Sequence, residues 1–380
     1  MRNEKIYDTA ITGGGLAGLT LSILLARKGF SVILFEKEKY PFHKVCGEYI
    51  SMESWNFLTK EIGLTLDQMN LPLIKRLQVT SPAGISLFAD LDLGGFGISR
   101  YLLDNSLKEI AVKEGVIVQE LCKTENISFG ENIFYIKTTC GDYQSKSCCG
   151  SWGKRSNIDI KWKRPFINKN YDRLNNYVCI KYHVAADIPS DMITLHNFKD
   201  GYCGISKIEN NMFCLCYFMK ASNLKNCGNS IERVEREILS QTPQLKELLE
   251  NITKRYDAPL SISQVSLSNK KAVENDVLML GDAAGMISPL CGNGMSIAMH
   301  SAKLAAANIS AFLNKEISRG GMERKYAEQR RKIFGARIKT GRLMQYLFGR
   351  TTATNIFIKI MKKSPYFTKK IIRFTHGQPF

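Results

Sequence analysis

The stretch that decides the fold is residues 6–36, IYDTAITGGGLAGLTLSILLARKGFSVILFE. It begins as a short apolar strand and runs directly into Gly13-Gly14-Gly15-Leu16-Ala17-Gly18. Apolar residues then recur at helical spacing as far as Arg27, and a second apolar strand over residues 31–35 ends at Glu36. This order of strand, GxGxxG loop, helix, strand and acid is typical of a Rossmann-type dinucleotide site.

Each part of this loop has a physical role. Gly13 allows the tight turn, Gly15 lets the backbone approach a pyrophosphate, and Gly18 lets the helix pack close to the strand. The N–H groups and the dipole at the helix N-terminus hold the phosphates, and Glu36 is placed to bind the adenosine ribose. The residues predicted to bind the cofactor here are Gly13, Gly15, Leu16, Ala17, Gly18, Glu36 and Lys37.

A second pattern of the same kind lies at residues 276–295. A strand over residues 276–280 leads into Gly281-Asp282-Ala283-Ala284-Gly285, and a proline-glycine loop then leads into a long helix. An acid at a strand end suits a sugar-alcohol hydroxyl, and backbone N–H groups at a helix start suit an anion or an electron-rich ring edge.

This second pattern resembles the second FAD motif of the p-hydroxybenzoate-hydroxylase-like flavoproteins. The resemblance implies that FAD is the cofactor, that Asp282 contacts its ribityl chain, and that Gly292, Asn293, Gly294 and Met295 lie beside the flavin pyrimidine. Residues 99–107, SRYLLDNSL, resemble the R-x2-L-D-x2-L helix of the same superfamily, which implies that Arg100 lies along FAD.

Residues 41–48, PFHKVCGE, resemble the K-x-C-G-(G/E) loop of the geranylgeranyl reductase-like branch. The resemblance implies reduction of carbon–carbon double bonds in an apolar, isoprenoid-like or polyene substrate, with NAD(P)H or a ferredoxin-like carrier as electron donor. It also implies that Cys46 faces the flavin as a candidate proton relay, and Glu48 is a weaker candidate acid. A packed thiol for Cys46 and a helix cap for Glu48 remain open alternatives.

Two other functions stay open. The same scaffold serves flavin-dependent monooxygenases that act on aromatic or polyketide substrates, and fold alone does not decide function. Where many flavin hydroxylases carry Gly-Ala-Asp-Gly, this chain has Trp152 in place of the acid, which disfavours hydroxylation with direct NADPH reduction. A flavin-binding sensor without catalysis would bind flavin but turn over with no reductant.

The middle of the chain predicts a second sheet. Residues 70–98 and 165–268 are strand-rich, with an amphipathic helix expected over residues 230–249. We expect a mixed α/β fold with a Rossmann-type FAD-binding domain (1–70, 96–164 and 269–320), an inserted antiparallel-sheet substrate domain (71–95 and 165–268) and a basic C-terminal helical region (321–380). Aromatic side chains expected to line the substrate space are Tyr177, Tyr182, Tyr202, Phe213, Tyr217 and Phe218.

The net charge of +18 is concentrated at the C-terminus, where no acidic residue follows Glu328. Basic residues alternate there with apolar ones, which suits an anionic membrane surface contacted through residues 329–373. A solvated helix pair packed on the core explains the pattern almost as well, and no nucleic-acid reader accompanies the charge. The eleven cysteines show no disulfide or metal-ligand spacing and no export signal is visible, so we expect no metal and a cytoplasmic protein with peripheral membrane contact.

Overall fold

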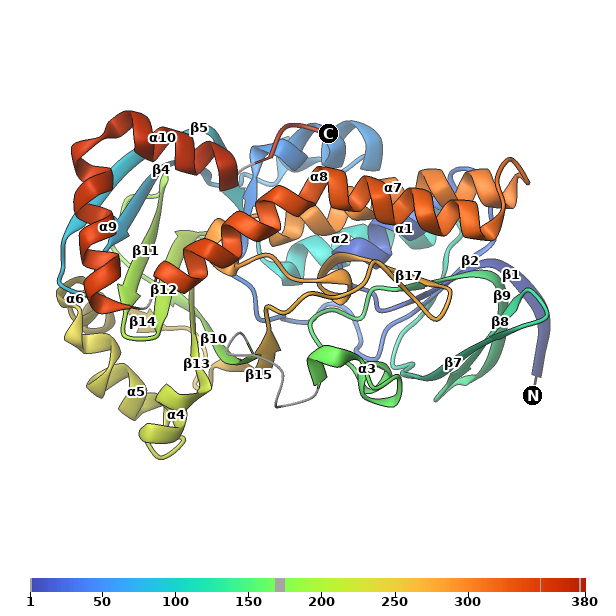
Figure 1. The fold of residues 1–380 in the computed structure, drawn as a ribbon, viewed down its shortest axis with the longest axis horizontal. Coiled ribbons are helices and arrows are strands. Elements are labelled where there is room, and N and C mark those ends of the chain that lie inside the picture. Colours follow the sequence, from blue (N-terminus) through green and yellow to red (C-terminus); the bar gives the residue numbers. More distant parts are fainter. Residues whose placement is uncertain (1, 168–174, 349, 376) are drawn as a thin grey trace.

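The computed structural model describes residues 2–167, 175–348, 350–375 and 377–380, which form two sheets with helices packed around them (Figure 1). Residues 168–174, 349 and 376 fall within the predicted ranges 165–268, 321–380 and 329–373 but lie outside the described residues, as does residue 1. The predicted mixed α/β architecture is confirmed, with a Rossmann-type sheet, a second sheet and C-terminal helices.

The first sheet is a parallel Rossmann-type sheet. Its strand order is β16-β17-β9-β1-β2-β6, in which β17, β9, β1, β2 and β6 run parallel and β7 and β8 pair off the edge of β9. Both faces of a parallel sheet are covered, and its inner strands β2 and β17 are accordingly apolar and fully buried. The strands are β1 (Arg2–Thr12), β2 (Val32–Phe35), β6 (Ile117–Gln119), β7 (Thr124–Gly130), β8 (Ile133–Thr138), β9 (Gly141–Gly150), β16 (Val273–Glu274) and β17 (Val277–Met279).

Alternation along these strands assigns each side chain to one face. Ile11 and Leu34 pack against the helices α1 (Leu16–Ala26), α2 (Arg100–Lys113) and α7 (Gly294–Leu313). Their neighbours Ala10 and Phe35 point to the other face, where the β7–β8–β9 meander covers them. A short helix, α3 (Asn157–Lys161), follows β9 and begins with a capping box at Ser156.

The second sheet is mostly antiparallel, with the order β14-β10-β13-β12-β11-β4-β5-β3 and β15 paired to β10. One pair, β4 with β11, is parallel. The helices α4 (Ala221–Asn226), α5 (Ile231–Glu237) and α6 (Pro243–Asn251) cover one face. The strands are β3 (Tyr49–Ser51), β4 (Leu73–Thr80), β5 (Ser86–Gly97), β10 (Asn175–Ala185), β11 (Met192–Phe198), β12 (Gly201–Lys207), β13 (Phe213–Lys220), β14 (Thr253–Lys254) and β15 (Leu260–Ser266).

The prediction of one helix over residues 230–249 is wrong. The chain forms α5, then a 3-10 turn over Leu239–Gln241, and then α6. Pro243 has no backbone N–H to donate into a continuing helix, but it fits the first turn of a new one, so α6 starts at this residue.

The sheets divide the chain differently from the expected domains at two places. Strand β3, from the 1–70 segment, pairs with β5 in the second sheet. Helix α8 (Arg319–Leu347) begins before residue 321 and packs along α7, so it continues the FAD-binding part into the C-terminal region. Helices α9 (Thr351–Lys363) and α10 (Pro365–Thr375) then fold over β4 and β5 (Figure 1). Within the described residues, no helix has the length and apolar character needed to cross a bilayer.

Candidate active site

A cleft with an empty volume of about 1280 Å³, including space open to solvent, lies between the two sheets. The loops after β1, β9 and β17 form one side, and the face of the second sheet opposite α4–α6 forms the other. Open α/β sheets bind their ligands at the carboxyl ends of the strands. The cleft is lined by Glu48 and by most of the predicted cofactor-binding residues, namely Gly15, Leu16, Ala17, Cys46, Arg100, Asp282, Gly292, Gly294 and Met295.

Three glycines set the backbone of the loop after β1. Gly13 has a φ of +107°, and a Cβ there would lie 2.6 Å from backbone atoms of the loop after β9. A Cβ on Gly18 would lie 2.1 Å from the Gly13 carbonyl oxygen, so only glycine lets α1 pack this close to β1. Beside Gly15, a Cβ would meet side-chain nitrogens of Arg100 and Lys44 at 3.6 and 3.7 Å. Gly15 therefore leaves space for an anion between the helix N-terminus and two cations.

The acid at the end of β2 reaches over this loop. The buried Glu36 carboxylate accepts the Gly14 N–H at 2.9 Å, and Lys44 Nζ lies 3.6 Å from it. Lys37, in contrast, has a side chain that is 66% exposed and that pairs with Glu38. The structure therefore places Lys37 outside the cleft, against the expectation that it binds the cofactor.

The second half of the site follows β17. A 3-10 turn over Gly281–Ala284 carries Asp282 to the cleft, and a second turn ends at Gly292, whose φ is +66°. Helix α7 then begins, with Gly294 and Met295 at the cleft wall. Asn293 is buried at the helix start and does not line the cleft. The N-termini of α1 and α7 thus both reach the cleft.

Arg100 is held in place by Asp104, one turn further along α2. Its Nε and Nη2 each donate to an Asp104 oxygen at 2.7 Å, and Lys44 Nζ lies 3.2 Å from the same carboxylate. Burial acts to lower the pKa of Arg100, but Asp104 outweighs it and raises that pKa above its ordinary value. Burial likewise acts to raise the pKa of Asp104, but Arg100 and Lys44 hold it below its ordinary value. Both partners therefore stay charged beside Gly15.

Glu48 forms a buried ion-pair cluster with the second sheet. One carboxylate oxygen accepts the backbone N–H of Arg100 at 2.8 Å and also pairs with the Lys181 ammonium. The other oxygen lies 2.6 Å from His183 Nε2. Burial alone would raise the pKa of Glu48, but Lys181 and then His183 overcome it, so the pKa lies below its ordinary value. A carboxylate that is ionised at neutral pH has no proton to donate.

This arrangement speaks against the expectation that Glu48 is an acid catalyst. The ion pair instead ties the Cys46 loop to β10. Cys46 does line the cleft, and its carbonyl oxygen accepts the Cys214 thiol at 3.2 Å. The proton-relay role of Cys46 stays a prediction.

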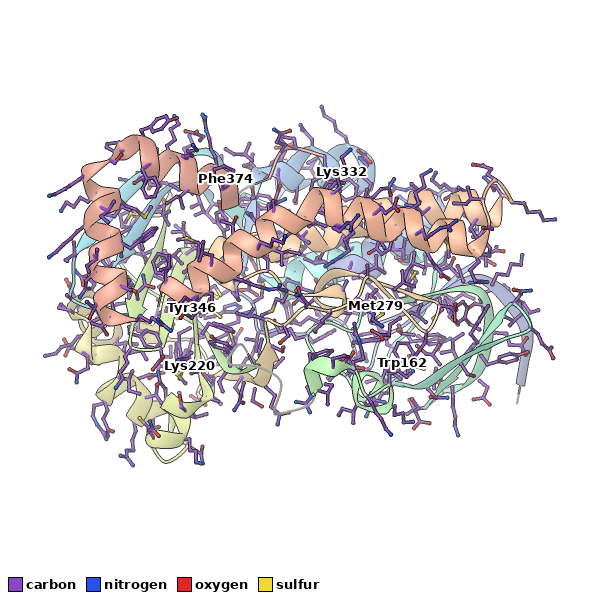
Figure 2. The ribbon with its side chains drawn as sticks, viewed as in Figure 1. Trp162, Lys220, Met279, Lys332, Tyr346 and Phe374 are labelled. Carbon is purple, nitrogen blue, oxygen red and sulfur yellow. The ribbon has the colours of Figure 1, made fainter. Side chains whose placement is uncertain are left out.

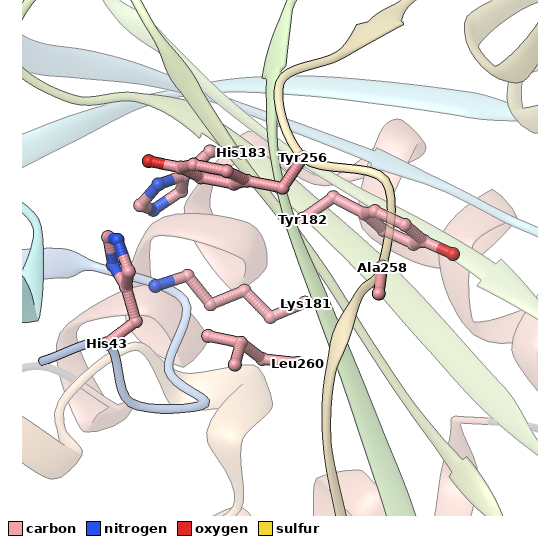
Figure 3. Close-up of a pocket in the computed structure, with 7 residues that line it drawn as sticks. All are labelled: His43, Lys181, Tyr182, His183, Tyr256, Ala258 and Leu260. Atoms are coloured by element: carbon pink, nitrogen blue, oxygen red, sulfur yellow. The ribbon is translucent and has the colours of Figure 1, made fainter.

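A second cavity, with an empty volume of about 410 Å³, lies behind this cluster. In Figure 3 the rings of His43 and His183 lie next to each other, edge to face, with the ammonium end of Lys181 pointing toward them. The two ring centroids are 5.1 Å apart. Ligand atoms of Glu48, His183 and Cys214 lie within 4.8 Å of one another, but the Lys181 ammonium already neutralises the carboxylate and opposes a metal cation.

Comparisons with known proteins agree with this geometry. Residues 11–44 match the model of an NAD(P)-binding Rossmann-like domain, and residues 205–366 match that of squalene epoxidase. Conditioned medium factor receptor 1 of Dictyostelium discoideum is 25% identical over 354 residues, covering 85% of this chain and 67% of that protein. Digeranylgeranylglycerophospholipid reductase 1 of Methanococcoides burtonii is 23% identical over 363 residues, covering 90% of this chain and 84% of that protein.

Solved structures share the fold over nearly the whole chain. A flavin-dependent brominase superposes with a TM-score of 0.78 at 18% identity, covering 98% of this chain and 93% of that one. A geranylgeranyl bacteriochlorophyll reductase-like protein from Thermoplasma acidophilum gives 0.80 at 16% identity, covering 97% and 95%. The chain thus has the fold of FAD-dependent flavoproteins. Its relatives include reductases and halogenases, and it is an enzyme.

The residues of this flavoprotein fit FAD. The glycine at position 15 and the two nearby cations suit a pyrophosphate at the N-terminus of α1. Asp282 and the N-terminus of α7 lie on the same cleft, where a ribityl chain and a flavin ring edge need a carboxylate and N–H groups. The cleft extends from these loops to the second sheet, so one elongated cofactor and an apolar substrate can share it.

The segment after β9 has a structural role in this flavoprotein. Trp152, which stands where hydroxylases carry an acid, donates its indole N–H to Asp159 at 3.1 Å. Ser151 donates to the Gly13 carbonyl oxygen at 2.5 Å, and Lys154 lines the cleft and donates to the Val45 carbonyl oxygen at 3.1 Å. The segment therefore braces the glycine loop.

Alternation corrects the expected aromatic lining. Tyr202 and Phe218 line the cleft, and Tyr177 stacks on Phe218 with centroids 4.5 Å apart. Tyr182 and Tyr217, with Phe213, point to the opposite face and pack under α4–α6. The functional residues that sequence reasoning missed are Lys181 and His183, two polar residues at alternate positions of an apolar strand. That alternation was the available signal.

Proposed function

We propose that this flavoprotein reduces carbon–carbon double bonds in an apolar, isoprenoid-like or polyene substrate. The observation that carries the proposal is an apolar wall of the cleft. Ile193, Leu195, Phe218 and Met286 line it. Such a wall excludes water and binds a hydrocarbon chain along its length. The relative from Methanococcoides burtonii, a digeranylgeranylglycerophospholipid reductase, supports this substrate class.

The chain's own residues would orient the cofactor and the substrate. Gly15 with Leu16 and Ala17, next to Arg100 and Lys44, would hold the pyrophosphate, and Asp282 the ribityl chain. Bound FAD, reduced by NAD(P)H or a ferredoxin-like carrier, would supply the hydride. Cys46, which also lines the cleft, is the residue we assign to proton transfer.

A flavin-dependent monooxygenase is the second candidate function. The match of residues 205–366 to squalene epoxidase favours it, because that range spans the second cofactor half and part of the apolar wall. The fold shared with a flavin-dependent brominase also leaves an oxygen-dependent reaction open. Both functions would use the same cleft.

Product mass separates the two functions. The purified protein, reconstituted with FAD, would be reduced with dithionite and mixed with a geranylgeranyl lipid, once without oxygen and once in air. A double-bond reductase adds two hydrogens, about 2 Da, in the anaerobic sample, as expected from hydride and proton transfer. A gain of one oxygen, about 16 Da, only in air would overturn the reductase and establish the monooxygenase.

We also propose that the C-terminal helices bring the protein to an anionic lipid surface, where such a substrate resides. Large apolar side chains are exposed on α8–α10, and Figure 2 labels two of them, Tyr346 and Phe374. Arg330 and Arg337 do not belong to this surface, because Arg330 bonds the Gly285 carbonyl and Arg337 pairs with Glu53. The remaining exposed apolar residues there are Leu343, Ile356, Ile360, Tyr366 and Phe367.

Sedimentation with lipid vesicles tests this contact. We expect the protein to bind phosphatidylserine-containing vesicles and to leave them at high salt, since cation–lipid attraction is screened. A Lys362→Glu, Lys363→Glu double variant should bind more weakly. Equal binding to purely zwitterionic vesicles would contradict the electrostatic part of the proposal.

A further inference from the structure

Two cysteines from neighbouring strands meet on the substrate wall of the cleft. Cys179 lies on β10 and Cys216 on β13, and their sulfur atoms are 3.4 Å apart. The strands are antiparallel, with Cys179 opposite Phe218 and Lys181 opposite Cys216. The two cysteines are therefore diagonal neighbours on one face, and both line the cleft. No other function described above uses them.

The surroundings favour a reactive thiol at this point. Contact with Cys216 lowers the pKa of Cys179 most, burial opposes that effect, and the ammonium groups of Lys154 and Lys181 lower the pKa further. Contact with Cys179, and then burial, raise the pKa of Cys216. A thiol with a lowered pKa that contacts a second thiol is the arrangement found in redox-active pairs, because the thiolate is the nucleophile.

The other cysteines lie in different environments. Cys148 and Cys149 are fully buried in β9, and burial raises the pKa of both thiols. Cys214, two residues from Cys216, is buried beside Glu48, and burial and then the Glu48 charge raise its pKa. Its thiol donates to the Cys46 carbonyl. Cys122 also contacts the exposed Cys140, but neither lines the cleft. The Cys179–Cys216 pair is thus distinguished by contact between two cysteine side chains together with access from the cleft.

We propose that Cys179 and Cys216 form a redox-active pair that hydrogen peroxide converts to a disulfide on the substrate wall. The Cys179 thiolate attacks one peroxide oxygen, the O–O bond breaks, and the leaving hydroxide takes a proton to become water. The Cys216 sulfur then attacks the sulfenic sulfur of Cys179, the S–O bond breaks, and a second water leaves. Two thiols and one peroxide thus give one disulfide and two waters.

The disulfide would change the cleft. A covalent bond needs sulfur atoms about 2 Å apart, so both side chains must move toward each other from their present separation. That movement draws β10 and β13 together beneath Tyr202 and Phe218, which line the same wall. The shape of the substrate space would then depend on the oxidation state of the pair.

Peptide mapping tests the pair directly and needs no enzyme assay. The full-length protein is treated with one equivalent of hydrogen peroxide, the remaining thiols are alkylated, and tryptic peptides are analysed by mass spectrometry. Cleavage after lysine and arginine places Cys179 alone in peptide 174–181, and Cys214 with Cys216 in peptide 208–220. We expect these two peptides to be joined, and two of the eleven thiols to be lost.

Matched variants locate the bond. Cys216→Ser should abolish the cross-link, while Cys214→Ser should retain it. Fragmentation of the wild-type cross-link assigns the partner sulfur even if a variant fails to fold. Peroxide treatment that leaves peptides 174–181 and 208–220 separate, joins Cys179 to Cys214, or ends at a sulfinic acid on Cys179 would overturn the proposal.

Discussion

The two sides of the cleft are specified in different ways. On the Rossmann side, the decisive positions are glycines, and what matters there is the absence of a side chain, as at Gly18. On the side of the second sheet, the decisive positions carry charge or sulfur, as at Lys181 and Cys179. A cofactor that many enzymes share is bound by a backbone that comes close to it. A particular substrate is bound by particular side chains. The comparison teaches that the cofactor half is local in sequence and the substrate half is not.

The largest effect is expected from filling the gap behind the glycine loop. Gly18→Val would place side-chain atoms within about 2 Å of the Gly13 carbonyl, so α1 could not pack on β1. Overpacking typically costs about 1–3 kcal/mol. Here the nearest atom is a backbone oxygen that cannot turn aside, so we expect the cost to lie well above that range. We expect the purified variant to lose its flavin absorbance and to melt at a lower temperature.

A matched control is Gly130→Val, at a position where an added Cβ meets no atom within 4 Å. That variant should keep its flavin. Normal flavin content in Gly18→Val would show that close packing of α1 is not what the site requires.

A smaller but still large effect is expected where the two sides meet. Glu48→Gln removes one partner of a buried ion pair and leaves Lys181 charged and unpaired, which typically costs about 3–5 kcal/mol. Glu48→Gln combined with Lys181→Met should recover much of that loss, since neither charge is then buried. Urea unfolding at pH 7 measures both variants, and equal stability of the single and double variants would contradict the coupling.

The ion pair of Glu48 also predicts how the free energy of unfolding changes at acidic pH. The folded-state pKa of Glu48 is lowered from its ordinary value of 4.5, so its contribution is complete above that pH. It is lost as the pH falls through the lower folded-state pKa. The Glu48→Gln, Lys181→Met protein should therefore lose less stability than the wild type below pH 4.5.

A third prediction concerns the second sheet alone. His196 is buried beside Thr80, and burial lowers its pKa from 6.5 to about 4. The unfolded chain therefore takes up a proton between these values that the folded protein refuses, so stability falls as the pH drops from 6.5 to 4, by about 3 kcal/mol. His196→Gln should flatten the unfolding free energy over this range.

The control for this prediction is His300→Gln. Burial lowers the pKa of His300 to about 4 as well, but its side chain is less buried than that of His196. We expect a smaller flattening there. If both variants keep the wild-type dependence of unfolding free energy on pH above pH 4.5, that dependence arises from other groups.

Much of the cofactor side could be predicted because its signals lie within one short segment. Gly13, Gly15 and Gly18 fall within six residues. Their spacing fixes the tight turn after β1, the approach of the backbone to a pyrophosphate and the packing of α1 on β1. Lys37 lies outside the cleft because it follows the end of β2, where the chain turns to solvent. Nothing in the motif constrains the direction of the side chain after the acid.

The second sheet was less predictable because its contacts depend on register. Cys179 and Cys216 meet only because β10 and β13 pair in one alignment. A shift of either strand by one residue would send its cysteine to the face covered by α4–α6. Glu48 reaches His183 across 135 residues of sequence. Neither contact can be recognised from neighbouring residues in the sequence. The alternation of Lys181 and His183 in β10 does indicate that one face of this strand is polar and is not ordinary core.

Helix α8 has a consequence for how substrates enter. At about 1.5 Å per residue, its 29 residues span about 43 Å. At one end Tyr326 bonds the Met279 carbonyl in the first sheet, and at the other Met344 packs against Val79 in the second. The helix acts as a splint across the joint, so the halves cannot swing apart as hinged jaws would. We therefore expect the width of the cleft opening, and not a domain movement, to limit which substrates enter.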